Sequence, residues 1–109
     1  MSDQAAPIIP VVVLPQEIDV TNADEAHQQL AEALTPGVAT VIADLTSTTF
    51  CDSAGVHAIM HAHELAAARD IDLRLAVSAD GSVRRVLQLT GAMRIMPVHS
   101  SVAEAMPPG

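Results

Sequence analysis

Short apolar runs rich in β-branched residues alternate with helix-like segments along the whole chain, and this alternation constrains the fold more than any other feature. The expected strands cover residues 8–14, 38–45, 72–77 and 95–98. The expected helices cover residues 23–34, 54–69, a segment that begins at Ser78 or Asp80 and ends at Gly91, and a last short segment after Ser101. The run 38–45, VATVIADL, is apolar on both faces, as strands of parallel sheets are. Such alternation with short connections predicts an α/β domain built around a largely parallel sheet.

Capping patterns mark several of the expected helix ends. Asn22 precedes Glu25 by three residues, which is the spacing of a capping box. Ser101 precedes Glu104 by the same spacing. We therefore expect Asn22 and Ser101 to be N-caps of the first and last helices.

The length and composition indicate one domain with an aliphatic core. A chain of 109 residues is long enough for one core, and half of its residues are hydrophobic. Phe50 is the single aromatic residue, so aliphatic side chains and methionine must fill the interior. We expect a single domain over residues 1–109, with residues 1–7 and 107–109 as flexible ends.

The charge balance excludes two classes of partner. Thirteen Asp and Glu residues against five Lys and Arg give a net charge of −8. Nucleic acids and anionic membrane surfaces both attract clustered basic side chains, so neither is an expected partner. No apolar run approaches a membrane span, and the first residues do not resemble a signal peptide. A single cysteine, Cys51, cannot form an internal disulfide, so we expect a cytoplasmic protein.

A tight group of small and polar residues, Asp52-Ser53-Ala54-Gly55, joins the second apolar run to the second long helix. Loops at the carboxyl ends of strands are the usual place for sites in α/β sheets. As an N-cap, Ser53 would stabilise the helix by about 1 kcal/mol. An exposed hydroxyl there could also be phosphorylated, since a phosphate of about −1.5 to −2 charges would face the positive end of the helix dipole. The residues alone leave both interpretations open.

Catalytic and metal sites find weaker support in the sequence. The nucleophile-elbow pattern G-x-S-x-G is absent around Ser53, which argues against a serine hydrolase. His57, His61 and Glu64 share a helix face, but Ala58 stands where H-E-x-x-H places its catalytic glutamate. A solvated polar face explains this trio better than a metal site. For Cys51, a small buried side chain at a strand end explains the residue better than a redox role. No glycine-rich phosphate loop supports nucleotide binding.

Three stretches together resemble one known family. They are the loop Phe50–Val56, FCDSAGV; the acidic turn Gln16–Asp19, QEID; and the segment 82–98, SVRRVLQLTGAMRIMPV. They are similar to the F-x-D-S-x-G-[VL] loop, the G-E-[LI]-D turn and the late helix of STAS domains of the bacterial anti-sigma factor antagonist (anti-anti-sigma factor) type. Gln16 departs from the glycine of the family's turn, and Ala54 replaces a second hydroxyl, which leaves Ser53 as the one acceptor in the loop.

The resemblance implies a fold and a regulatory role in transcription. The fold would be a small STAS-type domain with a roughly four- to five-stranded, mixed but largely parallel sheet and about four helices. The domain would not be an enzyme and would need no cofactor or metal. An anti-sigma factor that is also a serine protein kinase would bind the unphosphorylated form and release the sigma factor. That kinase would phosphorylate Ser53 and end the binding, and a serine phosphatase would reverse the modification.

The resemblance also implies a binding surface and an assembly state. The residues implied to contact the partner are Asp19, Glu17, Asp52, Ala54, Gly55 and Val56. The protein would be a monomer or a weak dimer, without direct contact to nucleic acid or membrane. The alternative is a STAS-like subunit of a membrane transport ATPase complex, in which the same fold clamps an ATPase and no serine is phosphorylated.

Overall fold

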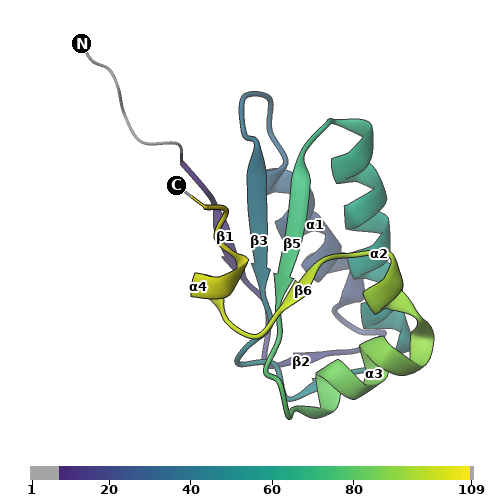
Figure 1. Ribbon diagram of the computed structural model, residues 1–109. Coiled ribbons are helices and arrows are strands. Elements are labelled where there is room, and N and C mark those ends of the chain that lie inside the picture. The colour runs from purple at the N-terminus through teal and green to yellow at the C-terminus, as the bar shows by residue number, and fades with distance from the viewer. Residues whose placement is uncertain (1–7, 109) are drawn as a thin grey trace.

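The computed structural model describes residues 8–108 (Figure 1). Residues 1–7 and 109, which belong to the ends predicted to be flexible, lie outside the described residues. The strands are β1 (Val11–Val13), β2 (Glu17–Ile18), β3 (Thr40–Asp44), β4 (Phe50–Cys51), β5 (Asp72–Ala76) and β6 (Val98–His99). The helices are α1 (Ala23–Ala33), α2 (Ser53–Ala68), α3 (Ser82–Thr90), the short 3-10 helix η1 (Ala92–Arg94) and α4 (Val102–Ala105).

The predicted α/β architecture is confirmed. Four strands form the main sheet in the order β1-β3-β5-β6, and every pairing in it is parallel. The central pair β3 and β5 is in register over five residues, from Thr40 opposite Asp72 to Asp44 opposite Ala76. A second, two-stranded parallel sheet pairs β2 with β4. It lies at the end of the main sheet toward which the strands run (Figure 1).

The two faces of the main sheet are covered unequally. Alternate residues of β3 point to opposite faces, so Val41 and Ala43 pack in the main core while Ile42 packs in a smaller cluster with Ala105. Helices α1 and α2 cover the first face and the single turn α4 covers the second (Figure 1). The main core is aliphatic, as predicted, and its largest fully buried side chains include Ile18, Leu30, Leu34, Leu45, Ile59, Leu73, Leu75 and Leu87.

Several local predictions differ from the structure at element ends. The expected strand 95–98 begins only at Val98, because Gly91 takes a left-handed conformation (φ 78°) and the chain then forms η1. The expected N-caps of α3, Ser78 or Asp80, are wrong: the N-cap is Gly81, without a side-chain hydrogen bond, whereas Gly91 ends the helix as predicted. The Ser78 hydroxyl instead donates to the Thr46 carbonyl at 3.2 Å.

The two predicted capping boxes have different outcomes. Ser101 is the N-cap of α4, and its hydroxyl accepts from the backbone N–H of Glu104 at 3.0 Å, as predicted. Asn22 is the N-cap residue of α1 by position, but its side chain makes no capping bond. Its amide oxygen accepts from the N–H of Asp19 at 2.9 Å and its amide nitrogen donates to the Glu17 carbonyl at 2.8 Å. Asn22 therefore fastens the preceding turn and not the helix.

Candidate functional site

The loop that the sequence singles out lies at the start of α2, where the helix is capped by a carboxylate. The N-cap is Asp52, and its Oδ1 accepts from the backbone N–H of Gly55 at 3.1 Å. The Asp52 carbonyl accepts the first helical bond, from Val56 N–H at 3.0 Å. The interpretation of Ser53 as the N-cap is therefore wrong. Ser53 is the first helical residue, one position further along.

This shift by one residue leaves the Ser53 hydroxyl available. Its side chain is exposed, and within residues 8–108 it makes no hydrogen bond, because the capping position belongs to Asp52. The backbone around it is held on both sides, by the cap and by the bond from Asp52 N–H to the Ile18 carbonyl at 3.1 Å. The result is an accessible alcohol on a fixed backbone.

Gly55 allows α2 to lie directly against the strands beneath it. A Cβ at this position would be 2.6 Å from Cys51 Sγ and 2.8 Å from Ile18 Cγ2, which is closer than side-chain atoms approach. Gly55 and Val56 are both buried. The glycine of the loop is thus required by close packing of the helix.

The acidic turn lies beside the serine loop. In the small sheet, Glu17 is opposite Phe50 and Ile18 is opposite Cys51. These pairings bring two segments more than thirty residues apart in the sequence to the same place as Ser53. Glu17 is exposed, whereas Asp19 is partly buried in its turn.

Asp19 is held in its charged form by its own turn. Its Oδ1 accepts from the backbone N–H of Thr21 at 2.9 Å and from the Thr21 hydroxyl. These hydrogen bonds, the hydroxyl first, lower the pKa of the Asp19 carboxyl because they stabilise the carboxylate. The Ser53 loop is therefore flanked by a carboxylate of defined orientation.

Cys51 lies beneath the loop and is not a candidate for surface chemistry. It is 3% exposed, and burial, together with the nearby Asp52 carboxylate, raises the pKa of its thiol to about 11. A thiol is nucleophilic only as the thiolate, so this side chain is inert at neutral pH. Its role as a small buried side chain agrees with the sequence interpretation.

A groove between α1 and α2 begins next to the serine, and the sequence predicts two of the three histidines that line it. The groove has a volume of about 530 Å³ and is lined by Val20, Ala23, Asp24, His27, Ala54, His57, Ala58 and His61. His57 and His61 are the pair that the helical spacing places on one face. His27 was missed, because nothing in the sequence relates a single histidine of α1 to α2. No group of three or more His, Cys, Asp or Glu residues within the described range could hold a metal ion.

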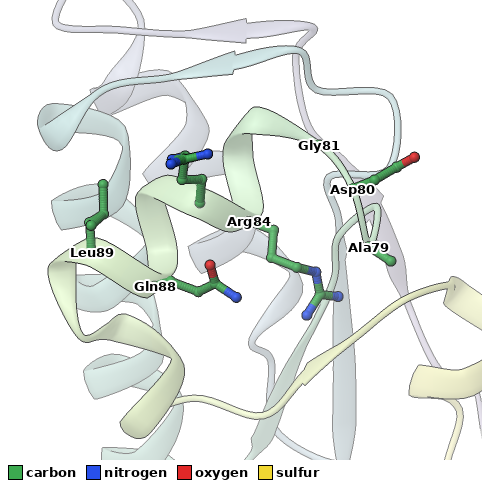
Figure 2. Close-up of a pocket in the computed structure, with 7 residues that line it drawn as sticks. Ala79, Asp80, Gly81, Arg84, Gln88 and Leu89 are labelled. Atoms are coloured by element: carbon green, nitrogen blue, oxygen red, sulfur yellow. The ribbon is translucent and has the colours of Figure 1, made fainter.

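A second hollow, of about 390 Å³, lies beside the start of α3 (Figure 2). It is lined by Ala79, Asp80, Gly81, Arg84, Arg85, Gln88 and Leu89. Arg84 extends from α3 on this side and donates to the carbonyls of Val77 at 2.9 Å and Ser78 at 3.2 Å. These bonds tie α3 to the end of β5, so Arg84 has a structural task. The lining contains no serine, threonine or cysteine that could be modified.

The model of the STAS domain family matches residues 3–105, so the chain belongs to the STAS domain family. This match covers both stretches that form the site, the acidic turn and the serine loop.

Solved structures have the same fold. An anti-sigma factor antagonist from Mycobacterium paratuberculosis superposes with a TM-score of 0.79 over 94% of this chain and 86% of that one, at 20% identity. A crystal structure from Thermotoga maritima, of a protein provisionally assigned the same role, gives a TM-score of 0.70 over 88% and 84%, at 23% identity. The NMR structure of that protein gives 0.75 over 97% and 94%, at 21% identity. At these identities the likeness is one of fold.

No curated protein matches the sequence significantly. Within residues 8–108, no helix is both long and apolar enough to cross a membrane.

Proposed function

We propose that this STAS domain is an anti-sigma factor antagonist controlled by phosphorylation of Ser53. In its unphosphorylated form it binds an anti-sigma factor that is also a serine kinase, and the sigma factor is released. The kinase transfers phosphate from ATP to Ser53 and the complex dissociates. A serine phosphatase restores the binding form, so the domain acts as a switchable binding module and not as a catalyst.

The observation that carries the proposal is the exposed Ser53 hydroxyl on a backbone that is already fixed. A kinase must bring a hydroxyl into line with its ATP, and a hydroxyl free of internal hydrogen bonds is ready for that transfer. Because Asp52 caps the helix, phosphorylation of Ser53 removes no capping bond. The added charge faces the positive end of α2, which tolerates it. Modification should therefore change the surface and preserve the fold.

The effect on binding follows from the neighbours of Ser53. Asp52, Glu17 and Asp19 already make this surface acidic. A phosphate would add about two negative charges and considerable volume at its centre. A partner fitted to a neutral hydroxyl at close range would lose contact with the loop.

The proposed contact residues divide into two groups by exposure. Glu17, Asp19, Asp52 and Ala54 reach the surface, so they are proposed to touch the partner directly. Gly55 and Val56 are buried, so their proposed part is to hold the loop in its binding conformation. The exposed side chains of Val20 and Phe50, at 78% and 48%, extend this surface with apolar area. Such a mixture is typical of protein–protein interfaces.

The first experiment is mass spectrometry of the tagged protein purified from its own cells. The expected result is phosphate on Ser53 in part of the molecules, and a protein kinase that co-purifies with the unphosphorylated part. With that kinase and ATP in vitro, wild type should gain one phosphate and lose binding. The Ser53→Ala protein should stay unmodified and bound, and Ser53→Asp should bind far less.

Ser82 provides a matched control. It is the first residue of α3, as Ser53 is of α2, but its hydroxyl donates to the Thr49 carbonyl at 2.8 Å. Ser82→Ala should leave phosphorylation unchanged. Equal binding by wild type and Ser53→Asp would count heavily against the proposal. Recovery with a transport ATPase, without phosphate on Ser53, would favour the clamp alternative.

A further inference from the structure

His57 lies one helical turn beyond Ser53 on the same face of α2. The two residues are the first and fifth of the helix, and both side chains are exposed. Residues four apart on a helix have Cβ atoms about 5–6 Å apart. Long helical side chains also lean toward the N-terminus, so the imidazole of His57 is directed toward the turn that carries Ser53.

The charged groups around this pair leave imidazoles as the cations that can reach a phosphate from the groove. Asp52 precedes Ser53, and the turn of Glu17 and Asp19 flanks the loop. From α1, Asp24 and His27 line the groove. From α2, His61 lies one turn beyond His57, and Glu64 follows it.

The arginines do not line the groove. The chain has no lysine, and its five arginines are outside the groove lining. Arg69 lies at the opposite end of α2 and donates to the Leu34 carbonyl. Arg74 is paired with Asp72 at 2.8 Å on β5. Arg84 is bonded to the end of β5, and Arg85 and Arg94 belong to α3 and η1.

We propose that His57 is the electrostatic partner of a phosphate on Ser53 and makes the switch sensitive to pH. The inference rests on the proposed phosphorylation of Ser53. A phosphoserine loses its second proton near pH 6, and an imidazole its proton near pH 6.5. Each charge stabilises the other, so a phosphate on Ser53 favours the charged imidazole of His57, and that imidazolium lowers the second pKa of the phosphate.

The net charge of the modified pair depends on pH. When the imidazole is charged, it offsets one charge of the phosphate dianion, and the pair carries about −1. When the imidazole is neutral, the pair carries about −2. Phosphorylation therefore repels the partner most strongly at higher pH and less strongly as pH falls toward 6. His57 thus acts through the phosphate and sets the net charge of the modified loop.

The test uses phosphoserine installed at position 53 during translation, which requires no kinase. Imidazole proton and phosphorus NMR signals are followed from pH 5 to pH 9 in the phosphorylated and unmodified proteins. The expected result is a three- to tenfold shift of the His57 proton equilibrium toward the charged form on phosphorylation. His99, on β6, should shift much less and serves as an internal control.

Two variants locate the effect. In His57→Gln, the second pKa of the phosphate should rise relative to wild type by the equivalent three- to tenfold factor. His61→Gln, one turn further along the helix, should retain most of the wild-type value. Since His57 is exposed, a circular dichroism spectrum should confirm that the variant is folded. The same phosphate pKa in wild type and His57→Gln would overturn the inference.

The two proposals can fail separately. Absence of phosphate on Ser53 in the native cells would count against the proposed function and would leave the measured coupling as it is. If Ser53 is phosphorylated in cells but the second pKa of the phosphate is unchanged in His57→Gln, the role of His57 would be overturned. The proposed phosphorylation switch would remain intact.

Discussion

The starts of α2 and α3 lie at the same end of the molecule but are built in opposite ways (Figure 1). At α2, the Asp52 side chain caps the helix and Gly55 is packed against Ile18 and Cys51. At α3, the N-cap is Gly81 and makes no side-chain bond. A Cβ on Gly81 would meet its nearest neighbour, Ser78 Cβ, at 3.5 Å, an ordinary contact.

Each helix begins with a serine, and the comparison explains why the two serines differ. Because Asp52 and the close packing at Gly55 hold the start of α2, the Ser53 hydroxyl has no structural task. At α3 the hydroxyl of Ser82 links the helix to the loop before β4 through the Thr49 carbonyl. Whether the serine hydroxyl is free therefore depends on which other groups hold the start of its helix.

The largest expected difference between the two starts is thiol reactivity. At pH 8, Cys51 should resist Ellman's reagent, because burial and a pKa of about 11 leave roughly a hundredfold less thiolate than a solvated cysteine with a pKa of 9.0 would have. A Ser82→Cys variant places a second thiol at an exposed helix start. That thiol should react at once and Cys51 only on unfolding, as measured by absorbance at 412 nm. Prompt reaction of two thiols would show that the start of α2 opens readily.

The second prediction concerns Gly55. Gly55→Ala should lower the free energy of unfolding by about 1–2 kcal/mol, because overpacking costs about 1–3 kcal/mol and alanine's helix propensity offsets up to about 1. The matched change Gly81→Ala should be neutral within about 0.5 kcal/mol, since the added methyl has room and the poorer cap is offset by lower unfolded-state entropy. Urea titration measures both. Equal effects would mean that α2 is not closely packed.

The third prediction concerns the cap. Asp52→Ala should destabilise the protein by about 1 kcal/mol, because the Gly55 N–H loses its acceptor. Asp52→Asn keeps an acceptor oxygen and should retain most of the stability. Both are measured by urea titration. If Asp52→Ala were neutral while Ser53→Ala destabilised, the cap would be the serine after all.

The smallest expected effect is a gain at the other helix. Gly81→Ser should stabilise the protein by a few tenths of a kcal/mol, because Gly81 has extended backbone angles (φ −86°, ψ 162°) that suit a capping hydroxyl. Thermal denaturation at constant pH measures the increase in Tm. A decrease would indicate that this position needs glycine, as Gly55 does, and would remove the contrast between the two starts.

The local interactions were predictable from sequence to the extent that they act between near neighbours. The alternation of apolar runs and helical segments predicted the parallel sheet, and the spacing of Ser101 and Glu104 predicted a real cap. The similar spacing of Asn22 and Glu25 predicted a cap that does not form, because Asn22 bonds to Glu17 and Asp19 in the preceding turn. Residue spacing alone does not show whether the Asn22 side chain caps the following helix or bonds to the preceding turn.

The sequence by itself determined the fold class, the position of the serine loop and its kinship with STAS domains. Only the tertiary structure decided that β2 and β4 pair, since two residues are too few to form a strand without a partner. It also decided that Asp52, and not Ser53, is the cap, and that His27 faces the same groove as His57. Contacts between distant segments depend on how helices and strands pack, and that packing selects which of several similar polar groups remains free.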